Sequence, residues 1–106
     1  MNQTLQLVQE LVARGEIRIS EHGYDELTAD NISVEDILYG VAAADLIEDY
    51  PEYFKGPSAL VLQKDLSGRP IHVVWGIPKG AGTPAVVVTA YRPEKDKWSD
   101  DFKTRL

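Results

Sequence analysis

The sequence predicts an α+β domain in which N-terminal helices pack on a C-terminal antiparallel β-meander of three to four strands. Apolar residues recur at helical spacing in the first half of the chain, whereas β-branched runs broken by Gly and Pro fill the second half. Helices followed by strands are typical of α+β folds. The 106 residues suffice for one core, and the sequence shows no linker or repeat, so we expect a single domain over residues 1–106.

Three helices are expected before residue 45. Apolar residues at helical spacing over residues 4–13 predict the first, and Gly15 is a natural stop. A second, short helix is expected from a cap at Ser20 to about Thr28. Ser33 opens the third, because Ser33 and Asp36 resemble a capping box with Asp in place of the usual Glu or Gln.

The character of the chain then changes from helical to extended. Runs bounded by Gly, Pro and Asp predict strands over residues 45–50, 58–64, 70–77 and 85–91. Pro93 is expected to end the last strand, because proline lacks the N–H group that a sheet ladder needs. Residues 98–106 are expected to form a short helix or a tail packed by its aromatic residues.

Composition and charge narrow the functional classes. The 17 acidic residues and 11 Lys and Arg give a formal net charge of −6, which argues against indiscriminate nucleic-acid binding. The acids crowd residues 21–49, whereas several cations lie in the strand-rich half, so a basic cleft on an acidic body stays open. The chain has no cysteine, secretory signal or long apolar run, so we expect a cytoplasmic protein that does not enter membranes.

Polar residues on the two longest expected strands are the first candidates for a site. His72 interrupts one apolar run, and Thr89, Tyr91 and Arg92 close the next. Imidazole, phenol and guanidinium groups together serve proton transfer and anion binding. Strand register decides whether His72 shares a face with Thr89 and Tyr91 or with Arg92. The sequence leaves both registers open, and ordinary structural roles remain as the alternative.

His22 is a second candidate because it lies at the start of an expected helix. The N–H groups at that end disfavour an imidazolium, whereas Glu26, four residues on, favours it. A surface histidine among acids is the alternative. Gly23 is a poor helix former, which indicates that bulk is unwelcome beside His22. No spacing typical of metal ligands occurs, and we expect no metal or cofactor.

Short motifs in a fixed order run from about residue 20 to residue 98. They are His22 at a helix start, Ile32-Ser33-x-x-Asp36-Ile37, Glu48-Asp49-Tyr50-Pro51, Arg69-Pro70-Ile71-His72-Val73-Val74, and Thr89-Ala90-Tyr91-Arg92-Pro93 followed by Trp98. Together they resemble the family called domain of unknown function 4258. That family is regarded as related to RelE-like and other small ribonuclease toxins, and some members are encoded beside a zinc-finger antitoxin-like protein.

The resemblance implies a compact α+β domain that cleaves RNA without a metal ion. In such chemistry a base activates the ribose 2′-hydroxyl, a cation stabilises the phosphorane and an acid protonates the leaving oxygen. The resemblance implies His22 or His72 as base or acid, Arg92 as phosphate clamp, and Tyr91 as hydrogen-bond donor or stacking surface. Substrate-binding roles are expected for Lys55, Arg69, Trp75 and Thr89.

One departure from the family pattern opposes this expectation. Many members carry arginines four and eight residues after the helix histidine, where this chain has Glu26 and Asp30. Two cations suited to phosphate have thus become acids, and together with the net charge this is also consistent with an inactive relative.

Two other classes of function stay open. The first is a non-catalytic domain that binds a protein partner, for example of antitoxin type, through the acidic residues 21–49 or through Tyr53 and Phe54. The second is a small-molecule site lined by Trp75 and His72. The sequence contains no clue to the identity of either ligand.

Overall fold

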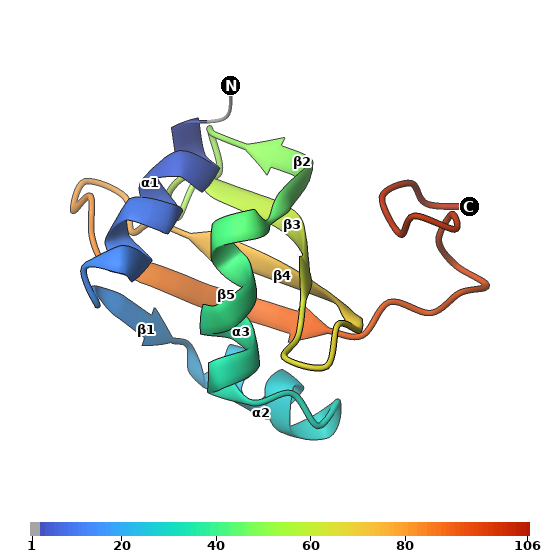
Figure 1. Cartoon of the computed structure of the whole chain (residues 1–106). Coiled ribbons are helices and arrows are strands. Elements are labelled where there is room, and N and C mark those ends of the chain that lie inside the picture. Colours follow the sequence, from blue (N-terminus) through green and yellow to red (C-terminus); the bar gives the residue numbers. More distant parts are fainter. Residues whose placement is uncertain (1–2) are drawn as a thin grey trace.

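Five strands form one sheet in the computed structural model, which describes residues 3–106 (Figure 1). The strands lie in the order β1-β5-β4-β3-β2. The elements are α1 (Gln3–Ala13), β1 (Ile17–Ile19), α2 (Glu21–Ala29), α3 (Val34–Gly40), the 3-10 turn η1 (Val41–Ala43), β2 (Asp45–Tyr50), β3 (Ser58–Lys64), β4 (Pro70–Gly76) and β5 (Ala85–Tyr91). The α+β class expected from the sequence is therefore confirmed.

The expected antiparallel meander of three to four strands is present, but it is part of a larger, mixed sheet. β2, β3, β4 and β5 are antiparallel neighbours, but β1 adds a fifth strand parallel to β5, with Ile17 opposite Ala85. The backbone N–H of Ala85 also donates to the carbonyl of Glu16 at 3.0 Å. A strand of three residues is too short to show a clear alternation of apolar and polar residues. Its place in the sheet could therefore not be predicted without knowing its distant partner, β5.

The helix caps formed as the sequence predicts. Gly23 N–H donates to the Ser20 hydroxyl oxygen at 2.9 Å, which starts α2. Ser33 and Asp36 exchange two backbone-to-side-chain hydrogen bonds of 3.0 Å, so α3 begins with a complete capping box. Both devices satisfy N–H groups that a helix start leaves without intrahelical partners.

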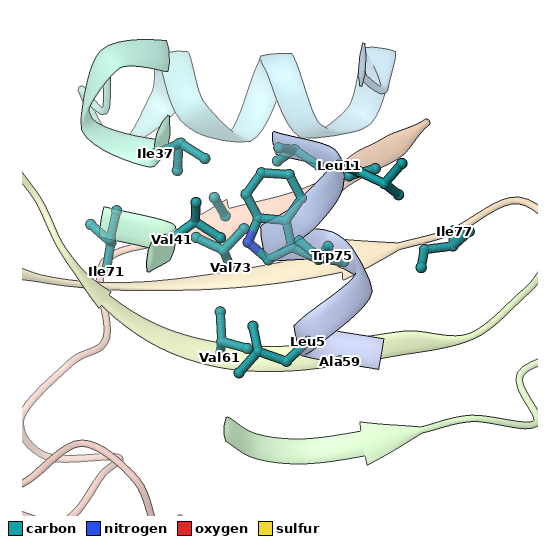
Figure 2. Close-up of a cluster of buried hydrophobic side chains, with 14 of the residues drawn as sticks. Leu5, Leu11, Ile37, Val41, Ala59, Val61, Ile71, Val73, Trp75 and Ile77 are labelled. Carbon is teal, nitrogen blue, oxygen red and sulfur yellow. The ribbon is translucent and has the colours of Figure 1, made fainter. Parts of the chain in front are cut away.

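One face of the sheet is buried under α1 and α3 (Figure 1). Trp75 projects from β4 into this core among apolar residues of both helices and is 0% exposed (Figure 2). Its indole N–H donates to the Gln63 side-chain oxygen at 2.8 Å, and the Gln63 amide donates to the Ile37 carbonyl at 2.9 Å. These bonds satisfy polar groups that would otherwise be costly to bury.

On the opposite face of the sheet, no helix formed by the described residues packs along the strands. Because strand residues alternate, His72 and Val74 face away from Trp75 and lie on this second face, which we call the open face. The last residues of the chain, 93–106, cover one end of it and are called here the C-terminal segment. This segment forms a tail with a single bridge between Trp98 and Arg105, and no helix.

A bulge in β5 changes which residues share a face. Val74 pairs with Thr89 but Trp75 pairs with Val87, so Val88 is an extra residue in the strand. The carbonyls of Val87 and Val88 both accept hydrogen bonds from Ser20, from its N–H at 3.0 Å and its hydroxyl at 3.1 Å. The bulge is therefore where the start of α2 joins the sheet.

Within residues 3–106, every helix is too short or too polar to traverse a lipid bilayer.

Gly23 provides a test of how closely α2 approaches the bulge. A Cβ at this position would lie 2.6 Å from the Val87 carbonyl oxygen and 3.2 Å from that of Val88. We expect Gly23→Ala to lower the free energy of unfolding by about 1–3 kcal/mol in urea denaturation, because the backbone of α2 or β5 must move to make room for the added methyl group. At an exposed helix position the same change would raise it by up to about 1 kcal/mol.

Asp25→Ala is the matched control, because Asp25 is an exposed residue of the same helix. Its free energy of unfolding should stay within about 0.5 kcal/mol of the parent. A Gly23→Ala protein as stable as the parent would contradict the close approach.

Candidate functional site

A groove of about 620 Å³ lies on the open face of the sheet. Residues of all five strands and of the β2–β3 loop contribute to its wall, and Val74, Val86 and Val88 give it an apolar floor. The described lining residues are Arg18, Ser20, Tyr50, Tyr53, Lys55, Gly56, Ser58, Val74, Gly76, Ile77, Pro78, Val86 and Val88. The groove is an opening on a sheet face, away from the core beneath α1 and α3.

The charge of the groove is opposite to that of the chain. Of its described lining residues only Arg18 and Lys55 are charged, and both are cations in a chain of net charge −6. Neither forms an ion pair with a carboxylate within residues 3–106, although the Lys55 ammonium lies 5.7 Å from the centre of the Phe54 ring. Cations without carboxylate partners remain free to bind an anionic ligand.

Two tyrosines border the groove beside these cations. Tyr50 is 40% exposed and Tyr53 is 47% exposed, so their rings are accessible from solvent. Burial, followed by a hydrogen bond to Glu48, raises the pKa of the Tyr50 hydroxyl above its usual value. Tyr50 is therefore a neutral hydrogen-bond donor at neutral pH. The hydroxyls of Ser20 and Ser58 also line the groove.

His72 and Tyr91, two of the expected catalytic residues, meet under the C-terminal segment. They are directly opposed on β4 and β5, and His72 Nδ1 lies 3.2 Å from the Tyr91 hydroxyl. His72 Nε2 lies 2.8 Å from the Phe102 carbonyl oxygen, which can only accept, so Nε2 carries the ring proton. Nδ1 then accepts from the Tyr91 hydroxyl. Trp98 packs edge-on against the imidazole with ring centres 4.4 Å apart.

Burial controls the protonation of this pair. His72 is 0% exposed, and desolvation lowers its pKa below the ordinary value of 6.5, with repulsion from Arg105 acting in the same direction. Burial likewise raises the pKa of the Tyr91 hydroxyl. At neutral pH both groups are uncharged, and His72 does not reach solvent while the segment is in place, whereas Tyr91 is only half-buried.

A second hollow, of about 590 Å³, lies between α2 and the beginning of the C-terminal segment. Its described lining residues are Glu26, Ala29, Asp30, Asn31, Tyr91, Arg92, Glu94, Lys97 and Trp98. His22 is nearby, because its Nε2 lies 3.6 Å from the Glu26 carboxylate. Three acids and two cations line this hollow, so it lacks the uniformly cationic lining of the groove.

Arg92 is held by acids on the side away from His72. Its guanidinium contacts the Asp65 carboxylate at 3.0 Å, and Asp65 is almost completely buried. The Arg92 backbone N–H donates to the Asp30 carboxylate at 2.7 Å, and its Nε donates to the Asp30 carbonyl at 3.3 Å. The guanidinium of Arg92 is thus already paired with a carboxylate. To bind a phosphate it would have to give up this partner.

The expected substrate-binding residues are dispersed. Lys55 lines the groove, and Thr89 lies half-buried on the open face opposite Val74. Arg69 is exposed, with its Nε 3.6 Å from the Asp65 carboxylate. Trp75 is in the core under the helices. Of these residues, Lys55 and Thr89 are on the same sheet face as His72 and Tyr91.

Sequence reasoning missed most of the groove. Arg18 and Tyr50 were not identified as candidates, and Tyr53 was expected only to contact a protein partner, although Arg18 alternates with Ile17 and Ile19. That alternation is the signal of a strand with one polar face. It locates Arg18 beside Val86 only once the parallel pairing of β1 with β5 is known.

No group of three or more His, Cys, Asp or Glu side chains within residues 3–106 is arranged to hold a metal ion.

Residues 19–92, well over half of the chain, match the family described as Domain of unknown function (DUF4258). The matched region contains α2, α3 and β2 to β5 but only Ile19 of β1, and thus every described groove residue except Arg18, together with His22, His72, Tyr91 and Arg92. The chain matches no curated protein and no solved structure.

The burial of His72 predicts a pH dependence of stability. The unfolded chain protonates its histidine near pH 6.5, before the folded chain does, because the folded pKa is lowered. The free energy of unfolding should therefore decrease as the pH falls from about 6.5 to about 5, above the range in which carboxylates titrate. Urea denaturation at a series of pH values measures this decrease.

Two variants separate His72 from the other titrating groups. His72→Gln should be less stable than the parent but should lack the decrease between about pH 6.5 and pH 5. His22→Gln, at an exposed position, should keep it. A decrease of equal size in the His72→Gln protein would contradict a buried neutral imidazole.

Proposed function

The chain belongs to the DUF4258 family, and we propose that it binds single-stranded RNA along the groove of the open face. The observation that supports this most directly is the pair Arg18 and Lys55, cations without carboxylate partners in an otherwise acidic chain. Single-stranded nucleic acids are bound by cations that follow the phosphates and by aromatic rings on which bases stack. Tyr50 and Tyr53 supply such rings at the edge of the groove.

The residues that line the groove favour binding of a single strand over a duplex. Its floor is apolar and its tyrosines are partly exposed, which suits unpaired bases with accessible faces. Only two cations are among the described residues that line the groove, so phosphate neutralisation contributes little to the affinity. The acidic remainder of the chain repels long duplexes and so opposes indiscriminate binding. Under this proposal the chain meets its RNA in the cytoplasm.

Fluorescence anisotropy with a labelled RNA of about ten nucleotides tests the proposal. Each of Arg18→Ala and Lys55→Ala should weaken binding, and each should reduce the slope of log affinity against log salt by about 0.7. Tyr53→Ala should weaken binding by about 1–3 kcal/mol while leaving the salt slope unchanged, because it removes stacking and no charge.

Lys64→Ala is the matched control for the two cations. Lys64 is also a cation without an ion pair within residues 3–106, but it lies at the opposite end of β3 from the groove residue Ser58. Its replacement should leave the affinity within about twofold of the parent. Equal losses for Lys64→Ala and Lys55→Ala, or no binding by the folded parent at low salt, would refute the proposal.

Metal-independent cleavage of the RNA is the second candidate function, and the second hollow is the observation that favours it. Tyr91 and Arg92 line this hollow together with Glu26, the partner of His22. His22 would act as base or acid, and Tyr91 would donate to a phosphate oxygen. A toxin of this kind would have a protein partner of antitoxin type.

Gel analysis of labelled RNA incubated with the protein and a chelator tests for cleavage. The parent should produce fragments ending in a 2′,3′-cyclic phosphate, and His22→Gln should reduce their rate by about 10²-fold or more. Asp25→Asn, on the same helix, should retain it. Intact RNA with the parent protein would leave RNA binding without catalysis, and equal cleavage by His22→Gln would contradict His22 as the base or acid.

A further inference from the structure

The C-terminal segment lies over His72 as a tail without helices. Trp98 packs against the imidazole, and the Phe102 carbonyl accepts the hydrogen bond from Nε2 at 2.8 Å. Trp98 is the one apolar residue of the segment that is buried, whereas Leu106 is 80% exposed. The segment therefore contributes little apolar burial beyond a single indole ring.

Two exposed ion pairs connect the end of the segment to the edge strand β2. Lys103 lies 3.3 Å from the Asp45 carboxylate, and Arg105 pairs with Glu48. Side chains of all four residues are between one third and three fifths exposed. Ion pairs of this exposure contribute little to stability and are screened by salt. The contacts that hold this end of the segment are thus easily broken.

The residues under the segment adjoin the groove. His72 precedes the groove residue Val74 by two positions on the same face of β4. Glu48, which pairs with Arg105, precedes the groove residue Tyr50 by two positions on β2. The covered imidazole of His72 and the open groove are therefore neighbouring parts of one sheet face.

We propose that the C-terminal segment is a displaceable cover, and that its release exposes His72, beside the half-buried Tyr91, as an extension of the groove. Release frees His72 Nε2 from the Phe102 carbonyl and removes Trp98 from the ring face. The exposed pair then offers an imidazole N–H and a phenol to a ligand in the groove. The release of the segment is inferred from the segment's own contacts. The role of the exposed residues in binding RNA rests on the proposed function.

Diethyl pyrocarbonate tests the opening in the full chain, because it acylates accessible neutral imidazoles. The chain has two histidines, of which His22 is exposed and His72 is buried, so His22 is an internal reference. Peptide mass spectrometry gives both rates. In the parent protein at low salt, His22 should react rapidly and His72 slowly.

The double variant Lys103→Gln/Arg105→Gln should raise the rate at His72 by several-fold, up to roughly tenfold, while His22 reacts as before. Raising NaCl from about 0.05 M to about 1 M should also accelerate His72 in the parent, because salt screens both pairs. Lys97→Gln is the matched control. It breaks the pair with Glu94 inside the segment, and both rates should stay unchanged.

A fixed segment gives a different result. If His72 reacts as slowly in the double variant and at high salt as in the parent, the cover proposal is overturned. Circular dichroism establishes that the double variant is folded; if it is not, the salt series on the parent decides alone. Acceleration at His72 with no RNA binding refutes the RNA proposal only, and RNA binding with an inert His72 refutes the cover only.

Discussion

The bulge at Val88 in β5 is the constraint on which both parts of the open face depend. A regular strand would alternate through residues 85–91 without interruption, whereas here Val87 and Ala90 both face the core. The extra residue therefore shifts Tyr91 to the face of His72 and Arg92 toward the buried Asp65. The same bulge presents the two carbonyls that bind Ser20.

The open face of the sheet is covered at one end and exposed at the other. At one end, the C-terminal segment desolvates His72 and keeps it neutral, with its single ring proton committed to a carbonyl. At the other end, no segment within residues 3–106 covers the apolar floor between Arg18 and Lys55. A net acidic chain thus has a locally cationic surface at this end of the open face. The acids at positions 26 and 30 make the second hollow less suited to phosphate, because Asp30 already binds Arg92.

Local features of this fold could be predicted from the sequence, and features that depend on distant partners could not. The capping box of Ser33 and Asp36 requires four consecutive residues, and it formed as expected. The bulge has no such signal, because the run from Ala85 to Tyr91 contains no Gly or Pro to mark an extra residue. Of the two registers considered for His72, the structure has the one that puts Thr89 and Tyr91 on its face, and the bulge adds the groove residue Val86 to the same face. Arg18 was missed because only the pairing of β1 with β5 brings it to the groove.

The most direct test of a functional open face is a two-dimensional ¹H–¹⁵N NMR titration of the labelled full chain with single-stranded RNA. The account predicts amide shifts confined to the groove, with the largest at Arg18, Lys55, Ser58 and Gly76, and no change in α1. Shifts centred on the second hollow, around Glu26 and Asp30, or a spectrum that does not change at saturating RNA, would contradict it.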